Sequence, residues 1–212
     1  MIDLYCERLG PGFWSEPVNA TTNLAFLVAA FLGWRAAKES NALSADVCVL
    51  IGLTALIAIG SGLFHTLATT WARWLDLIPI LAFQLAYVWV YGRRMAMIRA
   101  AYLAAIVLGF LGTALWARQF PHLLNGSLTY APAFVVLSVL GIYHFATRRT
   151  APALLLAASG VFAVSLAFRT VDAAVCPYFP LGTHFLWHLL NALLLYLLLR
   201  GLLVNLRNAR SR

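Results

Sequence analysis

The last apolar segment of the chain is Thr183-His-Phe-Leu-Trp-His-Leu-Leu-Asn-Ala-Leu-Leu-Leu-Tyr-Leu-Leu-Leu-Arg-Gly-Leu-Leu-Val204. As a helix it is long enough to cross a hydrocarbon core of about 30 Å, at about 1.5 Å per residue. Two histidines, His184 and His188, lie four residues apart near its start, so a helix places both on one face. This spacing lets two imidazoles bind one metal ion. The segment therefore predicts a membrane helix with a metal-binding end.

The composition of the whole chain is that of a membrane protein. Hydrophobic residues make up 63% of the 212 residues and charged residues only 10%, which excludes an ordinary soluble domain. Seven apolar windows are long enough to span a bilayer, at residues 17–36, 45–66, 75–92, 97–117, 128–146, 151–168 and 183–204. The sequence therefore predicts an all-α bundle of seven transmembrane helices. Because the breaks between windows are short, residues 1–212 are expected to form one domain, with a short outer segment at residues 1–16.

The basic residues predict the orientation in the membrane. The net charge is +8, but the arginines cluster between the apolar windows, a pattern of membrane topology rather than of nucleic-acid binding. One side of the membrane holds Arg8, Arg73, Arg118 and Arg169, and the other holds Arg35, Lys38, Arg93, Arg94, Arg99, Arg148, Arg149, Arg200, Arg207, Arg210 and Arg212. Since cytoplasmic loops carry the excess of basic residues, we expect the N-terminus outside and the C-terminus in the cytoplasm. No cleavable signal precedes the first window, which is expected to direct its own insertion.

A second polar motif lies far upstream of the histidine pair. His65 follows Ser61 by four residues in the second window, and Asp76 lies just inside the third. The predicted topology places these residues, together with His184 and His188, at one level near the outer face. Three neutral imidazoles on a rigid scaffold are what a catalytic zinc site needs, with a fourth position left for water. We therefore expect the five residues to meet around one zinc ion.

Plainer explanations exist for each of these residues taken alone. A histidine can lie at the membrane interface, bonded to backbone or water, and a carboxylate such as Asp76 is favoured at the N-terminus of a helix. Ser61 lies between Gly60 and Gly62, and small residues let membrane helices pack closely. Ionisable residues inside membrane spans are rare and usually functional, which favours the metal site for the three histidines together. The remaining two histidines, one in an outer loop and one near the inner face, are left out of the site.

The outer segments suggest two further features. Cys6 and Cys176 share the outer, oxidising compartment, so a disulfide between them would tie the N-terminal segment to the last outer loop. Two free thiols are the alternative. Asp3, Glu7 and Glu16 form a group of hard oxygen donors that suits calcium, and a solvated acidic tail is the alternative.

The combined motifs resemble the alkaline ceramidases, within the wider superfamily of seven-helix membrane hydrolases that includes the adiponectin-receptor-like proteins. The resemblance covers nearly the whole chain and rests on Asp3-Leu-Tyr-Cys-Glu7, Ser15-Glu-Pro-Val-Asn19, Ser61-x-x-x-His65, Asp76 and His184-x-x-x-His188. It implies a zinc ion held by the three histidines, with Ser61 and Asp76 beside it, and a disulfide between Cys6 and Cys176. It also implies a calcium site in the N-terminal segment. Glu7 and Glu16 match that pattern, whereas Leu4 and Leu9 fall where ligands are expected.

The resemblance also leads to an expected activity. We expect zinc-dependent hydrolysis of a lipid amide, either ceramide or a related N-acyl sphingoid lipid, to a fatty acid and a sphingoid base near the non-cytoplasmic face. Asp76 is expected to carry the proton from water to the leaving amine, and Ser61 to donate to the oxyanion. The alternatives are a seven-helix receptor with a structural zinc and a carrier whose histidines hold a redox metal or haem. Nothing in the sequence indicates a protein partner.

Overall fold

The structure of the protein, a computed structural model, describes the backbone of residues 1–210 and the side chains of residues 1–207. The regular elements of this part are helices, namely α1 (Pro17–Thr22), α2 (Leu24–Glu39), α3 (Ala45–Leu67), α4 (Thr70–Arg94), α5 (Ala100–Ala117), the 3₁₀ helix η1 (Leu123–Tyr130), α6 (Ala131–Ala146), α7 (Leu154–Val175) and α8 (His184–Arg210). Six of the helices are long and apolar enough to cross a membrane. With α2 as the seventh, the predicted all-α bundle is confirmed. Arg212 and the side chain of Arg210, both counted in the predicted topology, lie outside the described residues.

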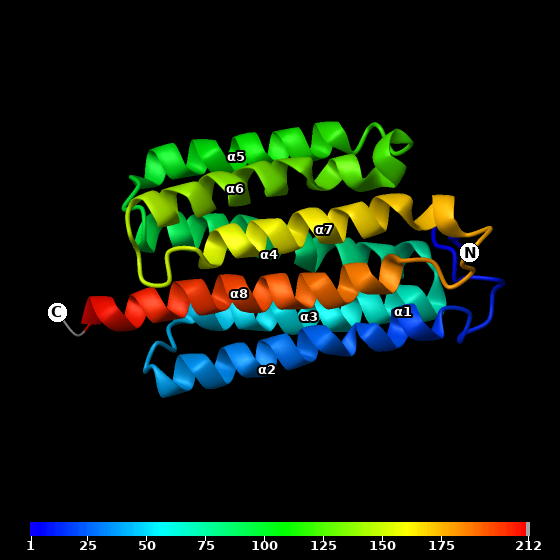
Figure 1. The fold of residues 1–212 in the computed structure, drawn as a ribbon, viewed down its shortest axis with the longest axis horizontal. Coiled ribbons are helices and arrows are strands. Elements are labelled where there is room, and N and C mark those ends of the chain that lie inside the picture. Colours follow the sequence, from blue (N-terminus) through cyan, green and yellow to red (C-terminus); the bar gives the residue numbers. More distant parts are fainter. Residues whose placement is uncertain (211–212) are drawn as a thin grey trace.

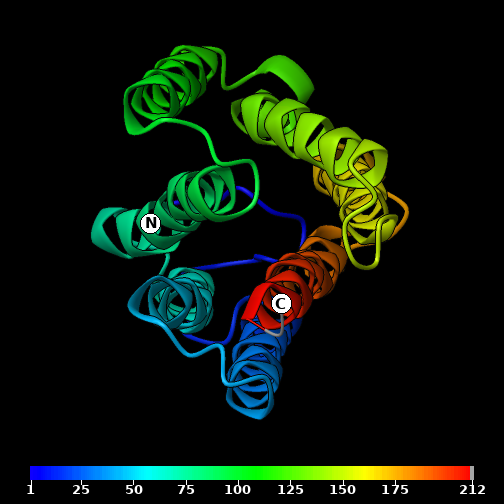
Figure 2. The ribbon, with the colours of Figure 1, turned by 90° about the vertical axis from the view of Figure 1, so that its left-hand side faces the viewer.

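The helices form a closed circuit that follows the order of the chain. From α2 to α8 each helix packs against the next, and α2 packs against α8, as the end-on view in Figure 2 shows. Buried apolar side chains from most of these helices fill the interior. The N-terminal segment lies at one end of the bundle and the C-terminus at the other (Figure 1), as an odd number of spans requires.

The first apolar window is divided at Asn23. The helices α1 and α2 on either side of it continue in one direction (Figure 1), and the backbone of Asn23 stays in the helical region, with φ −63° and ψ −20°. The Asn23 side chain is buried, and its amide donates to the carbonyl of Asn19 at 2.8 Å. The division leaves α2 with 16 residues, which is why it is not among the six long apolar helices.

A tight connection joins α3 to α4 at the end of the bundle that carries the N-terminal segment. Ala68 adopts a left-handed conformation and its N–H bonds to the carbonyl of Phe64 at 2.9 Å. Thr69 then caps α4 by accepting from the N–H of Ala72 at 3.4 Å. This cap starts α4 at Thr70, five residues before the predicted window at 75–92. The short connection brings the end of α3 beside the start of α4.

The two helices approach most closely at Gly60. A Cβ atom built there would collide with the backbone carbonyl of Leu75, whereas one built at Gly62 would meet no atom within 4 Å. The close contact therefore depends on Gly60 and not on Gly62.

The helix α7 is longer than its predicted window at 151–168. It continues to Val175, which carries Arg169 and Asp172 on a helix rather than in a loop. The Arg169 guanidinium donates to the carbonyl of Asn125 at 2.8 Å and to the hydroxyl of Ser127 at 2.9 Å. These bonds hold the kinked backbone of η1, in which Asn125 has a φ of 51°.

Candidate metal centre

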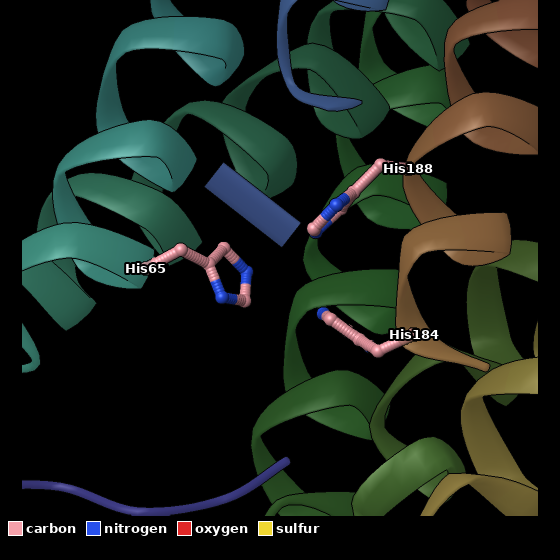
Figure 3. A group of neighbouring side chains, drawn as sticks. All are labelled: His65, His184 and His188. Atoms are coloured by element: carbon pink, nitrogen blue, oxygen red, sulfur yellow. The ribbon is translucent and has the colours of Figure 1, made fainter. Parts of the chain in front are cut away.

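Three histidines from two helices meet at one end of the bundle. His65 comes from the last turns of α3, and His184 and His188 come from the first two turns of α8. Their rings point toward a common space (Figure 3). The ring centroids lie 5.2 Å apart for His65 and His184, 4.7 Å for His65 and His188, and 4.6 Å for His184 and His188. One nitrogen from each ring lies within 4.8 Å of the other two, a spacing that a single ion can bridge.

Each ring has one buried nitrogen without a hydrogen-bond partner. These atoms are Nε2 of His65, Nδ1 of His184 and Nε2 of His188, and the three side chains are 1–2% exposed. Buried polar atoms nearly always have a partner, so three unpaired nitrogens that face one another call for a shared ligand. A metal ion satisfies all three at once, and an all-nitrogen donor set suits zinc. The residues present therefore fit the metal that the sequence led us to expect.

In His65 and His188 the other ring nitrogen, Nδ1, forms a hydrogen bond that orients the ring. The carboxylate of Glu16 accepts from Nδ1 of His65 at 2.5 Å. Nδ1 of His188 lies 3.0 Å from the hydroxyl of Thr22, which itself donates to the carbonyl of Val18 at 2.7 Å. Because a hydroxyl has one proton to give, Thr22 accepts from Nδ1 of His188. Both rings are thus held as the tautomer with a free lone pair on Nε2, the form in which a histidine binds metal.

Tyr5 covers the third histidine. Its ring stacks on that of His184, with 3.6 Å between the centroids and 15° between the planes. Burial raises the pKa of the Tyr5 phenol above its usual value, so the ring is neutral at any physiological pH. The stack covers His184 on the side of the N-terminal segment.

A buried carboxylate fixes the start of α8. Asp172 of α7 accepts from the backbone N–H of Thr183 at 2.6 Å and of His184 at 2.9 Å. Its other oxygen accepts from the N–H of Cys6 at 3.1 Å. A negative charge at this position satisfies the unpaired N–H groups of the helix and complements its dipole. Asp172 therefore positions His184 through the backbone.

The disulfide between Cys6 and Cys176 is present, with the Cα atoms 5.3 Å apart. It confirms the predicted link between the N-terminal segment and the loop before α8. Together with Asp172 it holds Tyr5 over the histidine rings.

Ser61 and Asp76 lie on neighbouring helices close to His65. Both are buried, and α3 and α4 approach each other most closely at Gly60, the residue before Ser61, where the backbone of Asp76 lies opposite. Ser61 lies one turn before His65 on α3. Asp76 is not one of the three grouped ligands. The structure thus groups the three histidines, with Ser61 one turn from His65 and Asp76 on the neighbouring helix.

The family comparison agrees with this arrangement. The model of the family described as ceramidase matches residues 11–209. The chain belongs to the ceramidase family. The match includes every helix and all three histidines of the site, so the resemblance drawn from the motifs is confirmed. The ceramidase family acts on a lipid substrate, and its name denotes hydrolysis of the ceramide amide. No curated protein matches the chain.

Two of the three acidic residues expected to bind calcium in this ceramidase-family chain, Glu7 and Glu16, form other contacts. Glu7 accepts from the backbone N–H of Val18 and of Asn19, both at 2.7 Å, and so caps α1. Glu16 pairs with Arg8 at 2.5 Å in addition to His65. Asp3 is exposed. Within residues 1–207 the only group of three or more His, Cys, Asp or Glu side chains with metal-binding spacing is the histidine group, so the calcium prediction finds no support.

Electrostatics explain how Glu16 stays ionised although it is buried. Burial alone would raise the pKa of this carboxyl, but hydrogen bonds from His65, Arg8 and Asn19 outweigh burial and lower it below the usual value. The sequence treated Glu16 only as a calcium ligand. Its role beside His65 depends on a contact between residues 49 positions apart, which no local pattern predicts.

The site also contains residues that sequence reasoning did not assign to it. These are Tyr5, Arg8, Thr22 and Asp172. Asp172 carried the clearest signal, because an acidic residue at the end of an apolar segment is costly unless it is paired. Asn191, three residues after His188, donates to the hydroxyl of Ser165 on α7 at 2.7 Å.

Proposed function

We propose that the chain is a zinc-dependent amidohydrolase that cleaves ceramide or a related N-acyl sphingoid lipid to a fatty acid and a sphingoid base. The observation that carries the proposal is the meeting of three buried imidazole nitrogens that have no protein partner. Three such donors suit a catalytic zinc, which keeps a fourth position for water or substrate. Family membership supplies the class of reaction.

The chemistry divides between the metal and two side chains. Bound zinc would supply a water of lowered pKa and would polarise the amide carbonyl. Asp76 takes the proton from the attacking water and returns it to the leaving amine, because a carboxylate beside the reacting atoms can act first as base and then as acid. Ser61 donates its hydroxyl to the carbonyl oxygen as negative charge develops there.

An apolar cavity inside the bundle supports a lipid substrate. Its volume is about 70 Å³, and its lining includes Phe26, Phe83, Phe110, Phe162, Trp187 and Leu198. The ring of Phe26 meets that of His188, with 6.5 Å between the centroids, so the cavity ends beside the metal site. Between Trp187 and Leu198 the lining follows α8 for about 16 Å, at about 1.5 Å per residue. This apolar lining beside the histidines suits the acyl chain of a lipid whose amide lies at the metal site.

We also propose that the site faces the non-cytoplasmic side of the membrane. The histidines lie against the N-terminal segment, since Tyr5 stacks on His184 and Arg8 bonds to the carbonyl of His65, and this segment lies at one end of the bundle (Figure 1). This end holds the smaller share of the basic residues, as the outer side does in membrane proteins.

The test is hydrolysis of a panel of N-acyl sphingoid lipids by protein stripped with a chelator and then reloaded with zinc. We expect release of fatty acid that is lost on stripping, restored by zinc and absent in His184→Ala. His122→Ala is the matched control, because His122 is exposed and outside the histidine group. Undiminished hydrolysis by the stripped protein would contradict the zinc dependence. Absence of hydrolysis by zinc-loaded protein across the panel would favour the receptor alternative.

A further inference from the structure

Arg8 is a buried arginine that contacts Glu16 and the backbone of His65. The Arg8 side chain is 0% exposed and its Nε donates to one oxygen of Glu16 at 2.5 Å. Its two other nitrogens donate to the carbonyl of His65 at 2.7 Å and to the carbonyl of Gly10 at 3.2 Å. All three guanidinium nitrogens therefore donate hydrogen bonds, one to the Glu16 carboxylate and two to the backbone carbonyls of His65 and Gly10.

The charge of Arg8 is balanced by Glu16. A buried charge is tolerated only when it is paired and hydrogen-bonded, and the Glu16 carboxylate is also buried. This carboxylate is one of the three, with those of Asp3 and Glu7, that the sequence assigned to calcium. The Arg8 guanidinium supplies a positive charge and fixed hydrogen-bond donors to the Glu16 carboxylate. A bound calcium ion would neutralise the same carboxylate. The chain thus carries its own cation in the N-terminal segment.

The pair also acts on a metal ligand. One oxygen of Glu16 binds Arg8 and the other accepts from Nδ1 of His65, while Arg8 bonds to the backbone carbonyl of His65. Arg8 therefore holds His65 at two points, through its backbone and through the carboxylate that orients its ring. Partners of this kind set the orientation and basicity of a ligating histidine.

We propose that Arg8 is a positioning residue of the metal site, and that its guanidinium takes the place of a bound calcium ion, so that the site assembles without calcium. The inference rests on the proposed zinc site. It differs from the family expectation of a calcium site in this segment, because Arg8 already neutralises Glu16 and the carboxylate of Glu7 caps α1.

The experiment measures zinc affinity by chelator competition on purified protein, with and without calcium at about 1 mM, the weak end of protein calcium sites. It compares the unchanged protein with Arg8→Gln and Arg8→Lys. Arg35→Gln is the matched control, because Arg35 forms an exposed ion pair with Glu39 far from the histidines in the chain. Thermal unfolding of the zinc-free proteins is measured in parallel, so that loss of the fold is separated from loss of the site.

We expect Arg8→Gln to lower zinc affinity about 10- to 100-fold, the usual effect of removing a group that supports a metal ligand. Arg8→Lys should recover part of this loss, because it restores the charge without the planar fork. Calcium should leave the zinc affinity of the unchanged protein as it is. Arg35→Gln should behave like the unchanged protein.

Three results would overturn the inference: equal zinc affinity in Arg8→Gln and the unchanged protein, no recovery in Arg8→Lys, or a zinc affinity of the unchanged protein that rises with calcium. If Arg8→Gln does not fold, two measurements still test the inference. These are the zinc affinity of Arg8→Lys compared with that of Arg35→Lys, and the effect of calcium on the zinc affinity of the unchanged protein. A protein that binds no zinc in any form would instead refute the proposed function.

Discussion

The contact between α3 and α4 at Gly60 allows a sharp prediction. Gly60 and Gly62 are two residues apart on one helix, but only at Gly60 would an added Cβ collide with the backbone carbonyl of Leu75. We predict that Gly60→Ala destabilises the protein and that Gly62→Ala does not. The collision is with backbone, which cannot rotate away as a flexible side chain can, so the two helices would have to separate.

The expected difference follows from two opposing effects. Replacing glycine by alanine inside a helix favours folding by about 1 kcal/mol, and this gain applies at both positions. Forcing an extra carbon into a packed contact costs about 1–3 kcal/mol, and we take the upper end because the obstacle at Gly60 is a carbonyl group. Gly60→Ala should therefore lower the free energy of unfolding by about 2 kcal/mol, and Gly62→Ala should raise it by about 1 kcal/mol.

The assay is reversible unfolding in mixed detergent micelles, followed by helix content, for both variants and the unchanged protein. Because the contact lies beside Ser61 and Asp76, Gly60→Ala should also reduce lipid hydrolysis at full zinc content. Equal free energies of unfolding for the two variants would refute the reasoning about the α3–α4 contact.

Three further predictions concern the polar residues and the disulfide. Asp172→Asn removes the charged group that accepts hydrogen bonds from three backbone N–H groups, and it should lower the free energy of unfolding by roughly 3 kcal/mol. Glu39→Gln, at an exposed position, is the control. An unchanged free energy of unfolding in Asp172→Asn would show that Asp172 does not fix the start of α8. Asp76→Asn should keep zinc but lose about 10²- to 10⁴-fold in turnover. Ser61→Ala should lower kcat by about 10²- to 10³-fold with little change in KM. A near-normal kcat at matched zinc content would show that the substituted residue has a structural role only. Cys6→Ser opens a loop with a sequence separation of 170 and should destabilise the protein by at most about 5 kcal/mol, seen by unfolding without reductant; identical unfolding of the oxidised and reduced unchanged protein would contradict this.

The parts of the fold that depend on local pattern could be predicted from the sequence. The apolar windows predicted the spans, and the four-residue spacing of His184 and His188 predicted that both lie on one face of the last helix. His65 could be added because the charge pattern placed it at the same level. These inferences need only the helical period and the length of a membrane span.

The parts that depend on distant contacts could not be predicted. Cys6 meets Asp172 across 166 positions, and no periodicity links the two. The close approach at Gly60 depends on which backbone atoms of α4 face it, and the sequence offered Ser61 as an equally small neighbour. Glu16 was assigned to calcium because its type suits that ion, but the choice between a bound ion and Arg8 as its partner is a matter of tertiary packing.

The central claim, that three histidines hold a catalytic zinc, is tested most directly by metal analysis of the purified protein and of its histidine variants. We predict about one zinc per chain, retained in His122→Ala and lost in folded His65→Ala, His184→Ala and His188→Ala. Full zinc content in all three of the latter variants, or no zinc in the unchanged protein after purification with zinc present, would contradict the account.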